Sequence, residues 1–91
     1  MPGRRSVRWT PVPHASFYDV VLRRNGVRML DVWPSRAHIS LAALMKRARR
    51  RLPAGRYEWF VYPGFGNRRA RANGGTFYGK ISARGVLSIH R

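Results

Sequence analysis

The 91-residue sequence has no cysteine, only three acidic residues and no long apolar run. The absence of cysteine excludes disulfides, thiolate nucleophiles and cysteine-ligated zinc sites. No stretch approaches the roughly 20 apolar residues that a membrane-spanning helix needs, so we expect no transmembrane segment. The first residues, MPGRRSVRWTPVP, are basic but lack an apolar h-region, so we expect no signal peptide in this chain.

The shortage of acids makes charge the most unusual property of the sequence. Nineteen lysines and arginines give a formal net charge of +16, and all but two of them are arginines. One interpretation is a polyanionic partner such as nucleic acid, acidic lipid or acidic glycan. The other is the arginine-rich coding of a GC-rich genome. Both stay open, because a basic chain attracts anions whatever the origin of its charge.

Length and composition otherwise indicate one globular domain over residues 1–91, with a core between residues 6 and 90. The apolar fraction of 44% and the aromatic fraction of 12% are typical of a folded chain. Ninety-one residues are enough for one modest core and too few for two.

Period-two alternation predicts a β-hairpin in the first third of the chain. The segment SFYDVVLRR (16–24) alternates apolar and polar residues, with Tyr18, Val20 and Leu22 on one face. Asn25-Gly26 follows, which is the strongest two-residue hairpin signal, and VRMLDVW (27–33) supplies the second strand.

Further short strands are expected before and after this hairpin. RYEWFVY (56–62) alternates, with Tyr57, Trp59 and Val61 on one face, and Pro63-Gly64 is expected to end it. The other expected β segments are 6–9, 37–41, 76–82 and 85–90. Short strands separated by turn signals indicate an all-β, antiparallel sandwich.

Residues 41–51 fit either a short helix or a looped connection. Ser40 is a suitable N-cap, and apolar residues recur at helical spacing at Leu41, Leu44, Met45, Ala48 and Leu52. Repulsion between the arginines opposes an isolated helix, so a helix here has to pack on the sheet.

Three sequence motifs together resemble a fibronectin type III domain over residues 6–89. They are Trp9-x-Pro-Val-Pro-x-Ala15-x-x-Tyr18-x-Val20-x-Leu22, then Asn25-Gly26, then Leu52-Pro-x-Gly55-x-Tyr57-x-Trp59-x-Val61. The stretches Val-Trp-Pro, Tyr-Pro-Gly-Phe-Gly and Tyr-Gly-Lys-Ile look like a variant found in surface or exported proteins of GC-rich bacteria. The resemblance therefore implies an immunoglobulin-like β-sandwich and an exported or surface location.

By the same resemblance, Trp9 is the core tryptophan and Tyr57 is a corner residue whose hydroxyl binds the backbone upstream. The spacing from Leu52 to Tyr57 is one residue shorter than usual in the family. Only five residues precede the strand at 6–9, so the usual first strand is short or missing and that strand is an open edge. The expected core consists of Trp9, Tyr18, Val20, Leu22, Tyr57, Trp59 and Val61.

Residues for catalysis are few and scattered. Asp19, Asp31 and Glu58 fall on separate predicted strands, and no serine has an evident base. The three histidines, His14, His38 and His90, show no spacing typical of metal ligands. We expect no enzymatic activity, no cofactor and no metal.

Basic and aromatic residues supply the candidate binding groups. The candidate polyanion-binding residues are Lys46, Arg47, Arg49, Arg50, Arg51, Arg68, Arg69 and Arg71. Phe60, Tyr62 and Phe65 form a candidate exposed aromatic face, which suits stacking on nucleic-acid bases. Alternatively, arginine stems cover these rings by cation–π contacts and the face is simply solvated.

The sequence therefore favours a non-catalytic interaction or structural module. Its partner is expected to be another protein or another copy of the chain, bound through loops, the aromatic face or the open edge strand. The alternative is a polyanion-binding module for nucleic acid or acidic glycan, which uses the arginine-rich segments 46–51 and 67–71.

Overall fold

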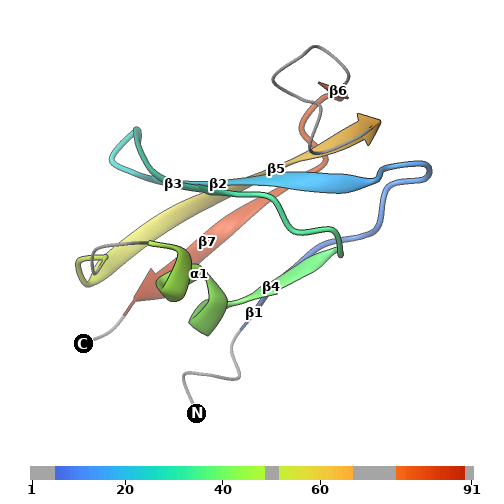
Figure 1. Ribbon diagram of the computed structural model, residues 1–91. Helices are drawn as coiled ribbons and strands as arrows, with labels where there is room; N and C mark the ends of the chain where they lie inside the picture. Colours follow the sequence, from blue (N-terminus) through green and yellow to red (C-terminus); the bar gives the residue numbers. More distant parts are fainter. Residues whose placement is uncertain (1–5, 49–51, 67–75, 90–91) are drawn as a thin grey trace.

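A computed structural model of the chain describes residues 6–48, 52–66 and 76–89. These residues form antiparallel strands and one helix (Figure 1). In chain order, the elements are β1 (Ser6–Arg8), β2 (Phe17–Arg24), β3 (Val27–Val32), β4 (His38–Ser40), α1 (Leu41–Arg47), β5 (Gly55–Gly66), β6 (Thr76–Tyr78) and β7 (Ala83–Ile89). The predicted all-β class is confirmed.

The large sheet has five strands, with β2 and β5 at its centre. β5 pairs with β2 from Phe17↔Gly64 to Arg23↔Glu58, and β3 lies on the other side of β2. β6 and β7 share the remaining edge of β5. The turn between β2 and β3 is Asn25-Gly26, where φ is 53° and 80°. Positive φ at both positions is what a tight type I′ hairpin requires.

The small layer consists of β1, β4 and α1, and it lies on one side of the large sheet (Figure 1). β1 pairs antiparallel with β4 from Ser6↔Ser40 to Arg8↔His38. The Trp9 N–H extends this ladder by donating to the Ala37 carbonyl at 3.0 Å. α1 starts directly after β4, so the strand and the helix cover the large sheet side by side.

One apolar core fills the space between the large sheet and the small layer. Val7, Leu41 and Leu44 enter it from the small layer, and Val20 and Leu22 enter it from the large sheet. Of the expected core residues, the structure buries Trp9, Tyr18, Val20, Leu22, Tyr57 and Val61. Trp59 is half-buried and packs at the edge of this core, where its indole lies over Gly85.

Two tyrosines hold loops to the core through their hydroxyls. The Tyr57 hydroxyl donates to the Pro53 carbonyl at 2.6 Å, and the Tyr57 ring is fully buried. The bond forms even though the spacing from Leu52 is one residue short. The Tyr18 hydroxyl accepts from the Val12 N–H at 3.0 Å. The Tyr18 ring packs edge-on against Trp9, with 5.3 Å between the ring centroids.

The prediction that Pro63-Gly64 ends the strand is wrong. β5 continues through both residues to Gly66. Pro63 lacks an N–H, but its carbonyl accepts from the Gly79 N–H at 2.9 Å, so the edge of the strand is still paired. Gly64 lies beneath the Phe17 ring, and a Cβ at this position would lie 2.5 Å from Phe17 Cζ. Gly64 therefore allows the Phe17 ring to approach the backbone closely.

Of the two alternatives for residues 41–51, the structure shows the short helix, which begins at Leu41 and ends at Arg47. Its first turn is capped by Ser40, whose hydroxyl accepts from the Ala43 N–H at 3.0 Å. Leu41 and Leu44 are its buried residues, as the helical spacing indicates. Within the described ranges, no helix is long and apolar enough to cross a membrane.

Candidate binding surface

All three acidic residues of the chain lie on one face of the large sheet. In the ladders, Val21 pairs with Asp31 and with Phe60, and side chains of paired residues share a face. Residues two positions apart in a strand lie on the same face. Asp19 is two residues from Val21 on β2, and Glu58 is two residues from Phe60 on β5, so all three acids share that face. It points away from the core, and we call it the outer face. Every other surface of the molecule is therefore without a carboxylate side chain.

The small layer and the β3–β4 connection next to it carry only cationic and neutral residues. Arg8, His38, Lys46, Arg47 and, in the connection, Arg36 are all exposed. Arg8 pairs with His38 across the β1–β4 ladder, which places these two side chains next to each other. Among the described residues, the Arg36 and Arg47 guanidinium groups have no hydrogen-bonded or ionic partner.

Basic residues on the outer face have acidic neighbours instead. Arg28 Nη1 lies 3.4 Å from Asp31 Oδ2, with side-chain exposures of 63% and 22%. Arg23 pairs with Glu58 across the β2–β5 ladder, and Arg56 and Glu58 lie together in a pocket at the end of the hairpin. The field of the outer face is partly neutralised, whereas that of the small layer is not.

α1 positions the basic end of the small layer. Leu44 is 1% exposed and fixes the helix against the core, while Lys46 and Arg47 follow on its last turn. Cations at this end interact favourably with the partial negative charge of the last carbonyls. The Ala48 N–H donates to the Leu44 carbonyl at 3.0 Å and closes the helix.

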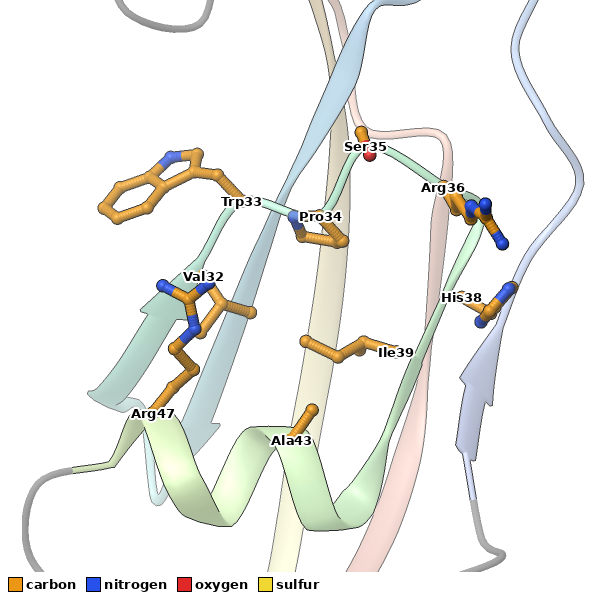
Figure 2. A pocket seen from close by; sticks show the side chains of 9 residues that line it. All are labelled: Val32, Trp33, Pro34, Ser35, Arg36, His38, Ile39, Ala43 and Arg47. Atoms are coloured by element: carbon orange, nitrogen blue, oxygen red, sulfur yellow. The ribbon is translucent and has the colours of Figure 1, made fainter.

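A pocket of about 290 Å³ opens between α1, β4 and the β3–β4 connection (Figure 2). Side chains of Val32, Pro34, Ile39 and Ala43 form an apolar floor. The Arg47 guanidinium stands at one end beside Val32, and Arg36 and His38 stand together at the other end (Figure 2). The remaining lining residues are Trp33, which is half-buried, and Ser35, which is exposed.

Patterns in the sequence did not predict this pocket. In the sequence, Trp33 and Pro34 were noted only as part of the Val-Trp-Pro stretch of the family resemblance. Arg36 and His38 were not candidate binding residues. A signal was present in the segment WPSRAH (33–38), which places an aromatic and two basic residues beside a proline. That signal becomes a site only when α1 is placed across from the segment.

The predicted aromatic face is less exposed than its period-two pattern indicates. Phe60, Tyr62 and Phe65 are each half-buried. The Arg23 guanidinium lies 5.3 Å from the centroid of the Phe60 ring, so an arginine covers part of this surface. Phe60 and Tyr62 lie on the outer face together with the acids, which makes that face unfavourable for a polyanion.

Most of the predicted polyanion-binding arginines lie outside the described residues. These are Arg49, Arg50, Arg51, Arg68, Arg69 and Arg71. Lys46 and Arg47 are described, and both are exposed on α1. The structure therefore brings two members of the first basic segment to the small layer.

No family model, curated protein or solved structure matches the chain. The arrangement of its own residues is thus the basis for any functional assignment.

The histidines and acids are the remaining residues suited to metal binding or catalysis. Among the described residues, no set of three or more histidine, aspartate or glutamate side chains is placed to hold a metal ion. His14 lies in a turn with φ of 68°, His38 begins β4 at the pocket, and His90 falls outside the described ranges. The acids lie on the outer face of the large sheet, whereas His38 lies on the small layer.

Proposed function

We propose that the chain is a non-catalytic, fibronectin type III-like interaction module that binds an acidic partner through its small layer. The observation that carries this proposal is the separation of charge. All three acids lie on the outer face of the large sheet, and the basic groups of the opposite layer form no ion pair among the described residues. An unneutralised basic surface attracts acidic partners and repels basic ones.

The arrangement of strands supports the fibronectin type III-like part of the proposal. One sheet contains β3, β2, β5 and β7, and β1 and β4 face it from the other layer. Two antiparallel sheets that face each other across one core are the architecture of this family. Among the described residues, no strand takes the place of the family's first strand beside β1. The Tyr57 hydrogen bond to Pro53 matches the corner expected from the resemblance.

A second copy of the chain is a weaker candidate for the partner than another protein. Each copy carries a formal net charge of +16, so two copies repel each other at low ionic strength. The outer face does not compensate, because Arg23, Arg28, Arg56 and Arg84 lie among its three acids. An acidic protein surface encounters no such repulsion.

A nucleic acid or an acidic glycan is the second candidate partner. The observation that favours it is the position of Lys46 and Arg47, which lie on the small layer at the start of the basic segment 46–51. Polyanion binding by such a segment depends steeply on salt, because each neutralised phosphate releases counterions.

The two surfaces can be compared directly by charge reversal. One double variant, Arg8→Glu with Lys46→Glu, changes the small layer outside the pocket. The matched double variant, Arg56→Glu with Arg84→Glu, makes the same charge change on the outer face, where both arginines are exposed. Binding to a labelled oligoglutamate and to a labelled single-stranded oligonucleotide is then measured over a range of salt concentrations.

The proposal predicts that reversal on the small layer weakens binding at least about tenfold more than reversal on the outer face, because removing close, complementary charges costs ~1.4 kcal/mol or more. Equal losses from both variants would contradict it, since they would mean that binding follows net charge alone. Oligonucleotide binding that persists near physiological salt, with weak oligoglutamate binding, would favour the second candidate.

A further inference from the structure

The pocket on the small layer combines an apolar floor with basic groups at both ends. Val32, at the floor, is 3% exposed, and Pro34, Ile39 and Ala43 are half-buried around it. The cavity of about 290 Å³ is just below the range for small-molecule ligand sites, about 300–1,000 Å³. It therefore suits one large apolar side chain better than a whole cofactor.

The basic groups are placed on opposite sides of this floor. Arg47 reaches it from the last turn of α1, and Arg36 and His38 flank it from the segment that leads into β4 (Figure 2). Neither guanidinium has a partner among the described residues. Each can therefore form a bidentate pair with a carboxylate without breaking an existing contact.

We propose that this pocket binds an acidic peptide segment in which one large apolar side chain is flanked by carboxylates. The apolar side chain enters the floor, and the carboxylates on either side pair with Arg47 at one end and with Arg36 at the other. This inference rests on the proposed function and specifies the chemistry of the partner. His38 and the adjacent Arg8 extend the basic surface along the same segment toward β1.

The floor distinguishes such a peptide from a nucleotide. Its four side chains, those of Val32, Pro34, Ile39 and Ala43, carry no hydrogen-bonding group. A nucleobase placed there would lose the hydrogen bonds of its edge to water and gain none from these side chains, which is unfavourable. An aliphatic or aromatic side chain has no such groups to desolvate, so it gains the full benefit of burial.

Three synthetic peptides test this composition. The first has one leucine between glutamates, the second has glycine in place of the leucine, and the third keeps the leucine but has glutamine in place of each glutamate. Binding to the full chain is measured by isothermal titration at low salt. Burial of one leucine predicts that the first peptide binds about tenfold tighter than the second, and loss of the carboxylates predicts that the third binds weakest.

Two pairs of variants locate the binding. Ala43→Phe fills the pocket, whereas Ala42→Phe places the same side chain on the exposed side of α1. Arg47→Glu reverses charge at the pocket, and Arg56→Glu does so on the outer face. Ala43→Phe should remove the difference between the leucine and glycine peptides, and Arg47→Glu should weaken the leucine peptide about tenfold more than Arg56→Glu does. Thermal melting of each variant checks that it is folded.

Equal affinity of the leucine and glycine peptides for the unmodified chain would overturn the inference. So would an Ala43→Phe variant that is folded and still distinguishes the two peptides. A loss of oligonucleotide binding in Ala43→Phe, with peptide binding unchanged, would overturn it in favour of a nucleotide. In each of these cases, the difference between Arg8/Lys46 and Arg56/Arg84 reversal tests the proposed function separately, because none of those four residues lines this pocket.

Discussion

On the outer face of the large sheet, Arg28 lies 3.4 Å from Asp31, whereas Arg36 and Arg47 at the small layer have no acidic partner among the described residues. Both surfaces are rich in arginine, so composition does not distinguish them. Their difference comes from where the strands place three carboxylates. In a chain with so few acids, the surface without acids is the one with its charge available for a partner.

The two surfaces also differ in the secondary structure that supports them. The outer face is built on β2 and β5, which pair over seven residues, from Phe17↔Gly64 to Arg23↔Glu58. The small layer has a ladder of three paired residues and a helix of seven residues. A helix of this length is unstable in isolation, so the basic surface depends on apolar side chains that fix α1 to the core.

Truncation of Leu44 on the small layer should have the largest effect on stability. Leu44→Ala removes a side chain that is 1% exposed, and we expect a loss of about 3 kcal/mol in the free energy of unfolding. Urea denaturation measures it. Val86→Ala is the matched control, because Val86 is 52% exposed on β7, and its cost should stay within about 0.5 kcal/mol. Similar costs for the two variants would mean that α1 does not depend on the core.

Removal of the Tyr57 hydroxyl should have the next largest effect. Tyr57→Phe deletes the hydrogen bond that fixes the Pro53 carbonyl to the buried Tyr57 side chain. We expect a loss of about 1 kcal/mol in the free energy of unfolding, measured by thermal or urea denaturation. Tyr62→Phe serves as the control, because no hydrogen bond of the Tyr62 hydroxyl is present among the described residues. An unchanged stability in Tyr57→Phe would contradict a structural role for the corner.

Reversal of one arginine on each surface should change stability in opposite directions. Arg28→Glu removes the pair with Asp31 and brings two acids together, so stability should fall by about 0.5 kcal/mol at low salt. Arg36→Glu relieves repulsion on a surface without acids, so the free energy of unfolding should rise by about 0.3 kcal/mol. Both effects should shrink in high salt. Changes of the same sign in the two variants would show that the surfaces do not differ in charge compensation.

Local sequence signals predicted the parts of this fold that depend on neighbouring residues. Asn25-Gly26 specifies its hairpin because few residues accept positive φ at two successive positions. The helical spacing of Leu41 and Leu44 likewise indicated which side of α1 is buried. The short helix expected within residues 41–51 is α1, and residues 49–51 lie outside the described residues.

Features that depend on distant residues were not predictable in the same way. β5 passes through Pro63 because the Gly79 N–H reaches its carbonyl, and that partner is 16 residues away in the chain. The half-burial of Phe60 depends partly on Arg23 from a neighbouring strand. The pocket requires the β3–β4 connection and α1 to be placed opposite each other. Alternation within one strand cannot indicate any of these contacts.

The most direct test of the charge-separation account is a map of backbone amide shifts by nuclear magnetic resonance as oligoglutamate is added at low salt. The account predicts that shifts concentrate in β1, β4, α1 and residues 33–37, and that β7 and the outer-face residues of β5 change little. Shifts of equal size on Arg56, Glu58 and Arg84 would contradict it, because the outer face would then bind the acidic partner as well as the small layer does.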